Sequence, residues 1–295
     1  MEVLWLGHSD CHDVHRVGAK AANLSRLAAC YRIPPGFCVS AEAYSRWVAF
    51  TNSSRPASPA QAISRPLYNA LASAYRSLAA MCGVSDPKVA VRSSAVEEDG
   101  ATRSFAGQYE TYLNIVGVDA VAEAVVRCWT SVRTDRVLAY HRELGMTIEG
   151  VRLAVLVQQL IPADTSAVVF SANPVTGSRD EVVINAGWGL GESIVSGTVT
   201  PDSYVIRKSD LAVVSCDIAE KRRMTVLTHE GTQEVPVPRG QQRSPSIDDT
   251  QVVELARLGM ALEVAMGWPV DIECAYQGRN LYLLQCRPIT TLDAR

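Results

Sequence analysis

The hydrophobic pattern of this 295-residue chain changes near residues 148–152. Before that point, apolar residues recur at helical spacing in 18–31, and the stretch 118–144 is predicted to be a helix with a basic stripe. After it, the apolar runs are short and bounded by turn residues, which is typical of strands. These runs are 153–160, 167–172, 181–185, 203–208 and 211–216. The sequence therefore predicts an α+β protein with two subdomains, residues 1–150 and 151–295.

The overall charge excludes several classes of partner. The chain is 47% hydrophobic and 20% charged, with a formal net charge of -3 and no run of Lys and Arg that would attract nucleic acid or an anionic membrane. No apolar run approaches the roughly 20 residues that span a bilayer, and the first twenty residues carry charges and histidines instead of a signal-peptide core. We therefore expect a cytoplasmic protein with neither nucleic acid nor membrane as a partner.

The cysteines do not form a recognisable metal or disulfide motif. They are scattered through the chain without a Cys-x-x-Cys pair, so we expect reduced and mostly buried thiols. Their positions are 11, 30, 38, 82, 128, 216, 274 and 286.

Two cations of the first subdomain occur where a phosphate would explain them. Lys20 falls in the first turn of the 18–31 helix, where the helix dipole favours anions over cations. Arg92 ends a predicted strand, and the later loop 104–111 contains small residues that let a backbone approach phosphates closely. An ordinary surface lysine remains the alternative for Lys20.

The final hairpin offers ligands for a hard cation. Gln285 and Arg287 share one face of their strand because side chains alternate. If the turn is the three-residue loop 278–280, Glu273 lies opposite Gln285 and Asp271 lies opposite Arg287. A two-residue turn would instead put Glu273 and Gln285 on opposite faces. A magnesium site made by this carboxylate and this amide therefore predicts the odd-length loop. A solvated polar face is the alternative.

Three further segments are less informative. Arg136 lies one helical turn from Arg133 and is able to face an anion, although neighbouring acids allow ordinary ion pairs. The Gly-rich stretch 186–192 does not fit G-x-G-x-x-G, so a tight structural turn competes with a nucleotide loop there. Residues 217–247 contain basic residues and prolines and are expected to form an irregular excursion.

Six motifs together resemble one known family. In chain order they are GAKAANL at 18–24, IPPGF at 33–37, VRSSA at 91–95, SFAGQ at 104–108, ANPVTG at 172–177 and LQCRPIT at 284–290. They resemble the ATP-binding domain of the phosphoenolpyruvate synthase and pyruvate phosphate dikinase family, which includes rifamycin phosphotransferases. The resemblance implies an ATP-grasp fold, in which two α+β subdomains close on ATP. It also implies transfer of the β-phosphoryl group to a histidine carrier, with release of AMP and phosphate.

The resemblance also implies roles for the cations. Lys20 and Arg92 would hold the phosphates, with Thr111 beside them, and Arg287 would face the phosphate that is transferred. Lys20, Arg92 and Arg287 are therefore the implied catalytic residues. Such a site acts by positioning and by neutralising charge on the phosphoryl oxygens.

The remaining implied ligands bind the nucleotide base and the metal. Gln158 and its neighbours Gln159 and Leu160 would line the adenine pocket, while Glu273 and Gln285 would bind magnesium. Arg136 and Glu192 also match family positions in nucleotide binding, with less defined roles.

The chain departs from the family pattern in two ways. Ala19 replaces the second glycine of a Gly-Gly-Lys start, a mild change that keeps Lys20 in place. In addition, none of the histidines, at 8, 12, 15, 141 and 229, lies in the Ser-His context of the family's swivelling domain. We therefore expect a separate phosphohistidine domain or subunit, and a small-molecule acceptor handled elsewhere.

Three functions remain open at this point. The first is an ATP-binding domain or subunit of a dikinase-type phosphotransferase. The second is a free-standing ATP-grasp kinase or ligase that phosphorylates a small molecule directly and releases ADP. The third is a nonenzymatic nucleotide-binding module, which is disfavoured because the metal pair and the phosphate-facing cations are all present.

Overall fold

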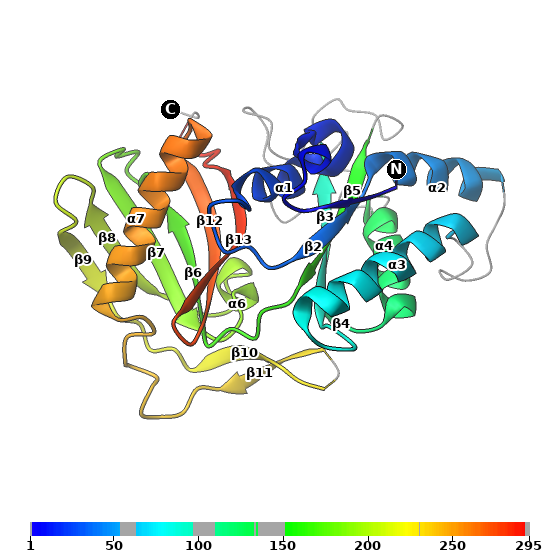
Figure 1. The fold of residues 1–295 in the computed structure, drawn as a ribbon. Helices are drawn as coiled ribbons and strands as arrows, with labels where there is room; N and C mark the ends of the chain where they lie inside the picture. The colour runs from blue at the N-terminus through cyan, green and yellow to red at the C-terminus, as the bar shows by residue number, and fades with distance from the viewer. Residues whose placement is uncertain are drawn as a thin grey trace. The chain divides into compact units, whose positions relative to one another are not determined.

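The computed structural model describes residues 2–53, 63–96, 110–132, 134, 151–229 and 231–292. The chain divides into two compact units, Met1–Leu160 and Ile161–Arg295, and each contains its own β-sheet (Figure 1). The expected α+β class is confirmed. Among the described residues, no helix combines the length and the apolar character needed to cross a membrane.

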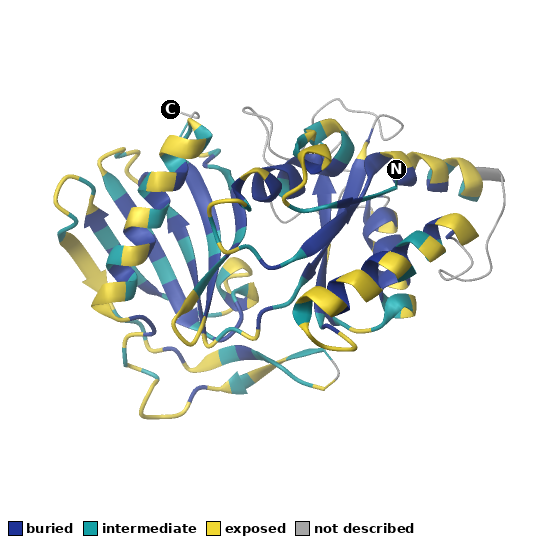
Figure 2. Ribbon diagram, in the orientation of Figure 1, coloured by how far each residue is buried: buried dark blue, intermediate teal, exposed yellow. Residues whose placement is uncertain are grey.

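The N-terminal unit is built on a five-stranded antiparallel sheet with the order β1-β2-β5-β3-β4. The central strand of this order, β5, is buried on both faces. Its residues 153–157 are all apolar and have no exposed surface (Figure 2). The strands are β1 (Val3–Trp5), β2 (Gly36–Val39), β3 (Val89–Ala95), β4 (Thr111–Ile115) and β5 (Leu153–Gln159).

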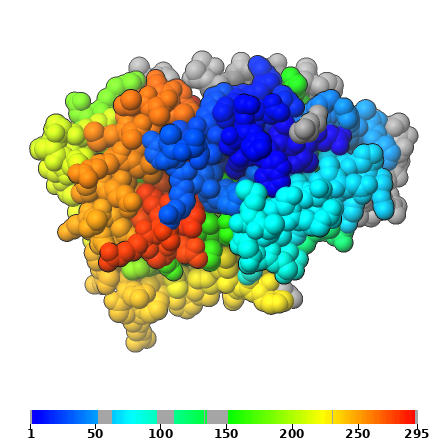
Figure 3. Space-filling model, in the orientation of Figure 1, coloured from blue at the N-terminus to red at the C-terminus, as the bar shows by residue number. Residues whose placement is uncertain are grey.

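Helices cover both faces of this sheet. On one face lies α1 (Val14–Leu27), which follows the 3-10 turn η1 (Ser9–His12). On the other face, α2 (Ala41–Ser53), α3 (Arg65–Cys82) and α4 (Val118–Ser131) share one hydrophobic core with the strands. In that core, the rings of Trp47 and Trp129 lie 5.4 Å apart. Helix α3 forms part of the outer surface, in cyan in Figure 3.

The expected subdomain boundary differs from the observed one. The sequence pattern assigns the strand over 153–160 to the second subdomain, but β5 pairs with β2 and β3 in the first sheet. The chain therefore changes units at Leu160. An apolar run predicts a strand, and it does not specify the sheet that the strand joins.

The C-terminal unit has a six-stranded antiparallel sheet with the order β13-β12-β6-β7-β8-β9. Helix α7 (Asp249–Met266) crosses one of its faces (Figure 1). A capping box of Asp248 and Gln251 begins this helix, and Gly267 ends it with φ +77°. The strands are β6 (Thr165–Phe170), β7 (Glu181–Trp188), β8 (Asp202–Arg207), β9 (Val213–Asp217), β12 (Val270–Gln277) and β13 (Asn280–Pro288).

The segment 217–247 is more ordered than the sequence predicts. It contains the two-stranded antiparallel hairpin of β10 (Arg223–Leu227) and β11 (Thr232–Pro236). Strand β10 also contacts the end of β7, where Gly189 forms a bridge with Thr225. The short helix α6 (Glu192–Val195) follows that bridge.

The cysteines remain thiols, as expected. All eight lie within the described residues and none forms a disulfide. Burial raises the pKa of Cys11 to about 11 and that of Cys128 to about 12. Cys30 and Cys216 are exposed.

The Cys128 thiol predicts a loss of stability in alkaline solution. The pKa of this thiol in the folded chain, about 12, lies above the ordinary thiol value of 9.0. The neutral buried thiol therefore contributes its full stabilisation of the fold below pH 9, and this stabilisation is lost as the pH rises toward 12. We expect the stability advantage of wild type over Cys128→Ala to shrink by about 1.4 kcal/mol per pH unit above pH 9. Urea unfolding at about pH 8 and about pH 10.5, on either side of the ordinary thiol pKa, measures it. The exposed Cys30→Ala variant is the control, and a pH-independent difference for Cys128→Ala contradicts the prediction.

Candidate functional site

In the N-terminal unit, three side chains singled out from the sequence lie on one face of the sheet. Val91 of β3 belongs to the core under α2, α3 and α4. Arg92 therefore points to the opposite face, on which α1 lies. Thr111 of β4 pairs directly with Arg92 and shares that face. Gln158 of β5 also lies there, because it alternates with the core residue Val157.

Lys20 reaches the same strand from α1. Its ammonium donates to the backbone oxygen of Ser93 at 3.3 Å. The helix is interrupted at Gly18, whose backbone is not helical (φ 74°, ψ 166°). Helical structure resumes after Gly18, so Lys20 occupies the first turn of the second segment. The helix itself begins at Val14, earlier than the sequence indicates, but the expected position of Lys20 in a first turn is preserved.

A close contact between α1 and β3 fixes this lysine. The Ser94 hydroxyl donates to the carbonyl of Val17 at 2.8 Å and accepts from the amide of Ala21 at 3.3 Å. A Cβ atom on Gly18 would lie 2.1 Å from the Ser94 carbonyl oxygen. Only glycine fits at this approach. Ser94 therefore acts as the docking point of α1, a role that its position beside Arg92 did not indicate.

The proposed adenine-pocket residues are held mainly through a turn. The side-chain amide of Gln158 donates from Nε2 to the Pro34 carbonyl at 3.1 Å, and this side chain is almost fully buried. The amide of Gln159 donates to Pro35, and the amide of Leu160 donates to Lys88. This segment is therefore anchored to the turn before β2, and in this structure the Gln158 side chain stabilises that turn.

The turn of the C-terminal hairpin is shorter than predicted, but Glu273 still lies opposite Gln285, as the magnesium hypothesis requires. The turn has two residues, because Gln277 pairs with Asn280, so the expected three-residue loop is wrong. Gly278 has φ +58°, as the first central residue of a type II′ turn requires. A β-bulge follows: Cys274 pairs with Leu283 while Glu273 pairs with Gln285, which leaves Leu284 as the extra residue.

The bulge restores the face that a two-residue turn would have changed. Glu273 lies directly opposite Gln285, and Asp271 lies directly opposite Arg287. On the other face of β12, the Tyr276 hydroxyl donates to Glu254 of α7 at 2.7 Å. The four residues Asp271, Glu273, Gln285 and Arg287, here called the hairpin cluster, therefore lie on the face of the sheet opposite α7.

Charge and burial order this cluster. Arg287 donates from Nε to one Asp271 oxygen at 2.8 Å, and its Nη2 forms an ion pair with the same oxygen at 2.7 Å. Burial raises the pKa of Asp271, and the Arg287 guanidinium partly offsets this effect. Gln285 is buried and Glu273 is partly exposed. The ion pair therefore orients Arg287 beside the carboxylate and amide.

The donor chemistry of Glu273 and Gln285 fits magnesium. Carboxylate and amide oxygens are hard ligands of the type that this cation prefers. Among the described residues, no group of three or more His, Cys, Asp or Glu side chains is arranged to hold a metal. A cation here would accordingly need oxygen ligands from a bound molecule or from water, as Mg²⁺ does when it bridges to phosphates.

Glu192 and Arg136 have different outcomes. Glu192 opens α6, is exposed, and accepts from the Thr232 hydroxyl at 3.4 Å. The glycines before it continue from β7: Gly187 lies in that strand, and Gly189 donates from its amide to the Asp164 carbonyl and accepts at its own carbonyl from the Ser166 hydroxyl. Arg136, Arg133 and the 104–109 part of the Ser-Phe-Ala-Gly-Gln loop lie outside the described residues.

Comparison with known proteins identifies the family. The family model described as "Pyruvate phosphate dikinase, AMP/ATP-binding domain" matches residues 55–295. The chain belongs to this family. The predicted resemblance is thereby confirmed, and the AMP/ATP-binding description applies to a match that contains the hairpin cluster, Arg92 and Gln158.

Members of the family with curated names are similar along almost the whole chain. A probable phosphoenolpyruvate synthase of Methanocaldococcus jannaschii is 38% identical over 98% of this chain, which covers 27% of that protein. A phosphoenolpyruvate synthase of Pyrococcus furiosus is 34% identical, with 98% and 44% covered. A rifampicin phosphotransferase of Streptomyces sviceus is 38% identical, with 98% and 36% covered. The chain thus spans less than half the length of each of these relatives.

The Gly18 contact predicts a large effect of one methyl group. Gly18→Ala places a Cβ against the Ser94 carbonyl at a positive φ, so we expect it to lower the free energy of unfolding by at least about 3 kcal/mol. Gly83→Ala is the matched control, because Gly83 also has positive φ (+68°), but a Cβ there would meet no atom within 4 Å. We expect it to cost about 1 kcal/mol. Denaturant unfolding measures both, and equal losses contradict the role of the close contact.

Proposed function

We propose that this chain is the ATP-binding part of a dikinase-type phosphotransferase. In the proposed reaction, the β-phosphoryl group of ATP passes to a histidine carrier, and AMP and phosphate are released. The observation that carries the proposal is the hairpin cluster, in which an acid–amide pair suited to magnesium lies beside an arginine oriented by Asp271. Family membership and the names of the relatives support it.

The proposed roles follow the chemistry of each side chain. Lys20 and Arg92 bind phosphate oxygens, with Thr111 beside Arg92, and Arg287 binds the phosphoryl group that is transferred. Lys20 is held in a helix first turn, where the backbone N–H groups also favour an anion. Each cation neutralises charge on the phosphates and orients the chain of phosphoryl groups, which is the main contribution of a protein to this type of reaction.

Glu273 and Gln285 are the proposed magnesium ligands. When bound, the ion would neutralise the phosphate oxygens that it contacts. Gln158, Gln159 and Leu160 are proposed to contact the adenine, with their backbone held by the Pro34–Pro35 turn and by Lys88. Glu192 and Arg136 are proposed as further nucleotide contacts. We also propose the ATP-grasp fold for the two units.

We place the histidine carrier and the acceptor site in another part of the protein or in a partner subunit. The relatives are more than twice as long as the part that this chain matches, which leaves room for such domains. None of the five histidines of this chain lies in a Gly-rich Ser-His context. The absence of disulfides among the eight cysteines supports our proposal of a cytoplasmic location.

The identity of the product tests the proposal. The chain is incubated with Mg²⁺ and ATP, with and without a separately produced phosphohistidine domain from a phosphoenolpyruvate synthase, and the nucleotides are separated by chromatography. AMP and phosphate that form only with the histidine domain support the proposed reaction. ADP formed with a small-molecule acceptor and no histidine domain would establish a direct kinase instead. Binding of ATP without turnover under either condition would indicate a nucleotide-binding module.

Glu273 should be essential for magnesium-dependent turnover. Glu273→Ala removes the one carboxylate of the proposed metal pair, so we expect turnover to fall by at least about 100-fold while the fold is retained. Asp210→Ala, which removes an exposed acid that pairs with Arg207, is the control and should keep its activity. Phosphate release assays across a magnesium titration measure both. Full activity of Glu273→Ala would refute the metal assignment.

Arg92 should contribute mainly to ATP binding. A charge-assisted hydrogen bond is worth about 1.5–3 kcal/mol, so Arg92→Ala should weaken ATP binding by about 10- to 100-fold. Arg46→Ala removes an exposed arginine that pairs with Glu2 and Glu42, and it should bind ATP as wild type does. Isothermal titration with ATP compares the variants. An unchanged affinity of Arg92→Ala excludes its phosphate role.

A further inference from the structure

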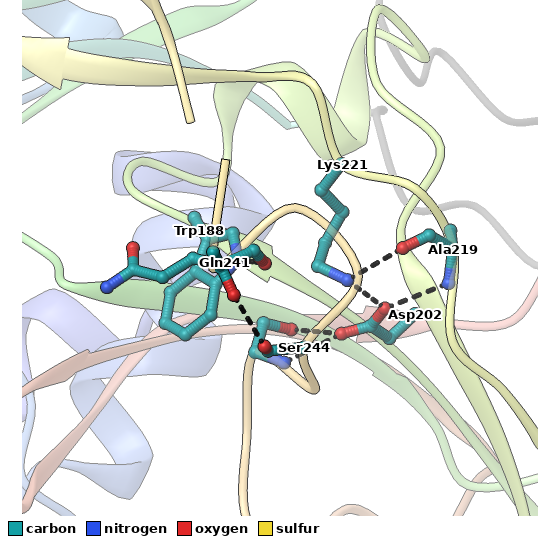
Figure 4. Close-up of polar contacts among 8 residues, drawn as sticks. Trp188, Asp202, Ala219, Lys221, Gln241 and Ser244 are labelled. Atoms are coloured by element: carbon teal, nitrogen blue, oxygen red, sulfur yellow. Dashed lines mark hydrogen bonds and ion pairs between the residues drawn. The ribbon is translucent and has the colours of Figure 1, made fainter. Parts of the chain in front are cut away.

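A fully buried ion pair lies in the C-terminal unit, and neither of its residues belongs to the hairpin cluster (Figure 4). The side chains of Lys221 and Asp202 are 1% and 0% exposed. The Lys221 ammonium donates to one Asp202 oxygen and, at 3.0 Å, to the carbonyl of Ala219. Nothing in the sequence indicates this pair, because Lys221 stands among basic residues in a segment expected to be irregular.

The hydrogen bonds of Asp202 join three segments of the chain. Its Oδ1 also accepts from the amide of Ala219 at 3.1 Å. Its Oδ2 accepts from the amide of Ser246 at 2.8 Å and from the Ser246 hydroxyl at 2.7 Å. Asp202 itself begins β8, and its partner across the sheet is Ala186 of β7. The carboxylate thus fastens both ends of residues 218–247, here called the strap, to the sheet.

Attaching the strap through a buried pair of charges has a large desolvation cost. Removing two charges from water costs several kcal/mol per ion, and the interaction recovers that energy only with good geometry and further hydrogen bonds. Such a pair therefore contributes little net stability, and its best-supported effect is to specify one arrangement over others. At this site, what it specifies is the position of the strap.

The strap in turn contacts the Gly-rich loop 186–192. The amide of Leu190 donates to the Thr225 carbonyl of β10 at 2.8 Å. Gly189 has φ +75°, and a Cβ there would lie 2.3 Å from the same oxygen. The Trp188 indole donates to the Gln241 carbonyl at 3.3 Å (Figure 4). At the end of the loop, Glu192 accepts from Thr232 of β11.

From these contacts we infer that Asp202 and Lys221 are positioning residues for nucleotide binding. They hold the strap so that Thr225 fixes the backbone of Gly189 and Leu190, and through this backbone they set the position of Glu192 at the start of α6. The inference rests on the proposed function, in which Glu192 contacts the nucleotide. Neither residue is required to touch the nucleotide itself.

The central test compares Lys221→Met with Lys208→Met. Lys208 also pairs with an acid in this unit, Glu263 of α7, and that ion pair does not involve the strap. Hydrogen–deuterium exchange is measured for loop 186–192 relative to β6 and β12, and ATP binding is measured by calorimetry. We expect Lys221→Met to speed exchange in the loop at least about 10-fold over the reference strands and to weaken ATP binding about 10-fold. Lys208→Met should change neither.

Two further variants keep the test decisive if Lys221→Met does not fold. The double variant Asp202→Asn with Lys221→Met removes both buried charges, so no unpaired charge remains to unfold the chain. Gly189→Ala blocks the contact with Thr225 and keeps the ion pair, while Gly197→Ala is its control, because Gly197 has φ +71° and an open surrounding. The double variant and Gly189→Ala should reproduce the faster loop exchange and the weaker ATP binding, and Gly197→Ala should not.

The outcomes separate this inference from the proposed function. Folded charge variants with wild-type exchange in the loop, or with a loosened loop and wild-type ATP affinity, overturn the positioning role. A lower melting temperature alone, with exchange raised equally in the loop and the reference strands, shows a purely structural pair and also overturns it. A wild-type chain that does not bind ATP overturns the proposed function, and the positioning of Glu192 for nucleotide binding falls with it.

Discussion

The register of β12 is the constraint on which the C-terminal unit depends. This strand pairs with β13 on one side and β6 on the other, and its side chains alternate between two environments. Ile272 and Cys274 are buried on the side of α7, whereas Asp271 and Glu273 lie on the opposite side. A slip of one residue would move both carboxylates under the helix, where burial of unpaired charge is costly. The register in which β12 pairs with its two neighbours therefore decides both which side chains form the apolar core and which form the hairpin cluster.

The N-terminal unit uses backbone contact for a similar purpose. Lys20 and Arg92 carry like charges that repel, yet the fold packs α1, which carries Lys20, against β3, which carries Arg92. The glycine break in α1 permits a backbone approach to β3 that no side chain would allow, and Ser94 bonds on both sides of that break. In both units, polar groups are fixed by bonds to the backbone or to an opposite charge.

The sequence predicts the features that depend on local periodicity and fails where distant segments decide. With the observed two-residue turn, alternation alone would put Glu273 and Gln285 on opposite faces, so their pairing depends on the bulge. The α+β class and the final hairpin do follow from alternation and spacing. The turn length does not, because a bulge at Leu284 supplies the extra residue and nothing in Leu-Leu-Gln indicates it. Strand β5 is predictable as a strand, but its partners lie far earlier in the chain. The β10–β11 hairpin escapes prediction because its composition resembles a loop and distant groups hold it. Lys221 pairs with the carboxylate of Asp202, and the Thr225 carbonyl accepts from the amide of Leu190.

The distribution of the thiols has a practical consequence for solution studies. Cys30 lies in the N-terminal unit and Cys216 in the C-terminal unit, and both are exposed, while Cys11, Cys38, Cys128, Cys274 and Cys286 are buried. A thiolate must form and be reached before a maleimide attaches, and burial opposes both steps. Cys82 of the N-terminal unit is half-buried, so a chain with Cys82→Ser carries one exposed attachment point for a fluorophore in each unit. The separation of the two units and its response to added nucleotide then become measurable by energy transfer.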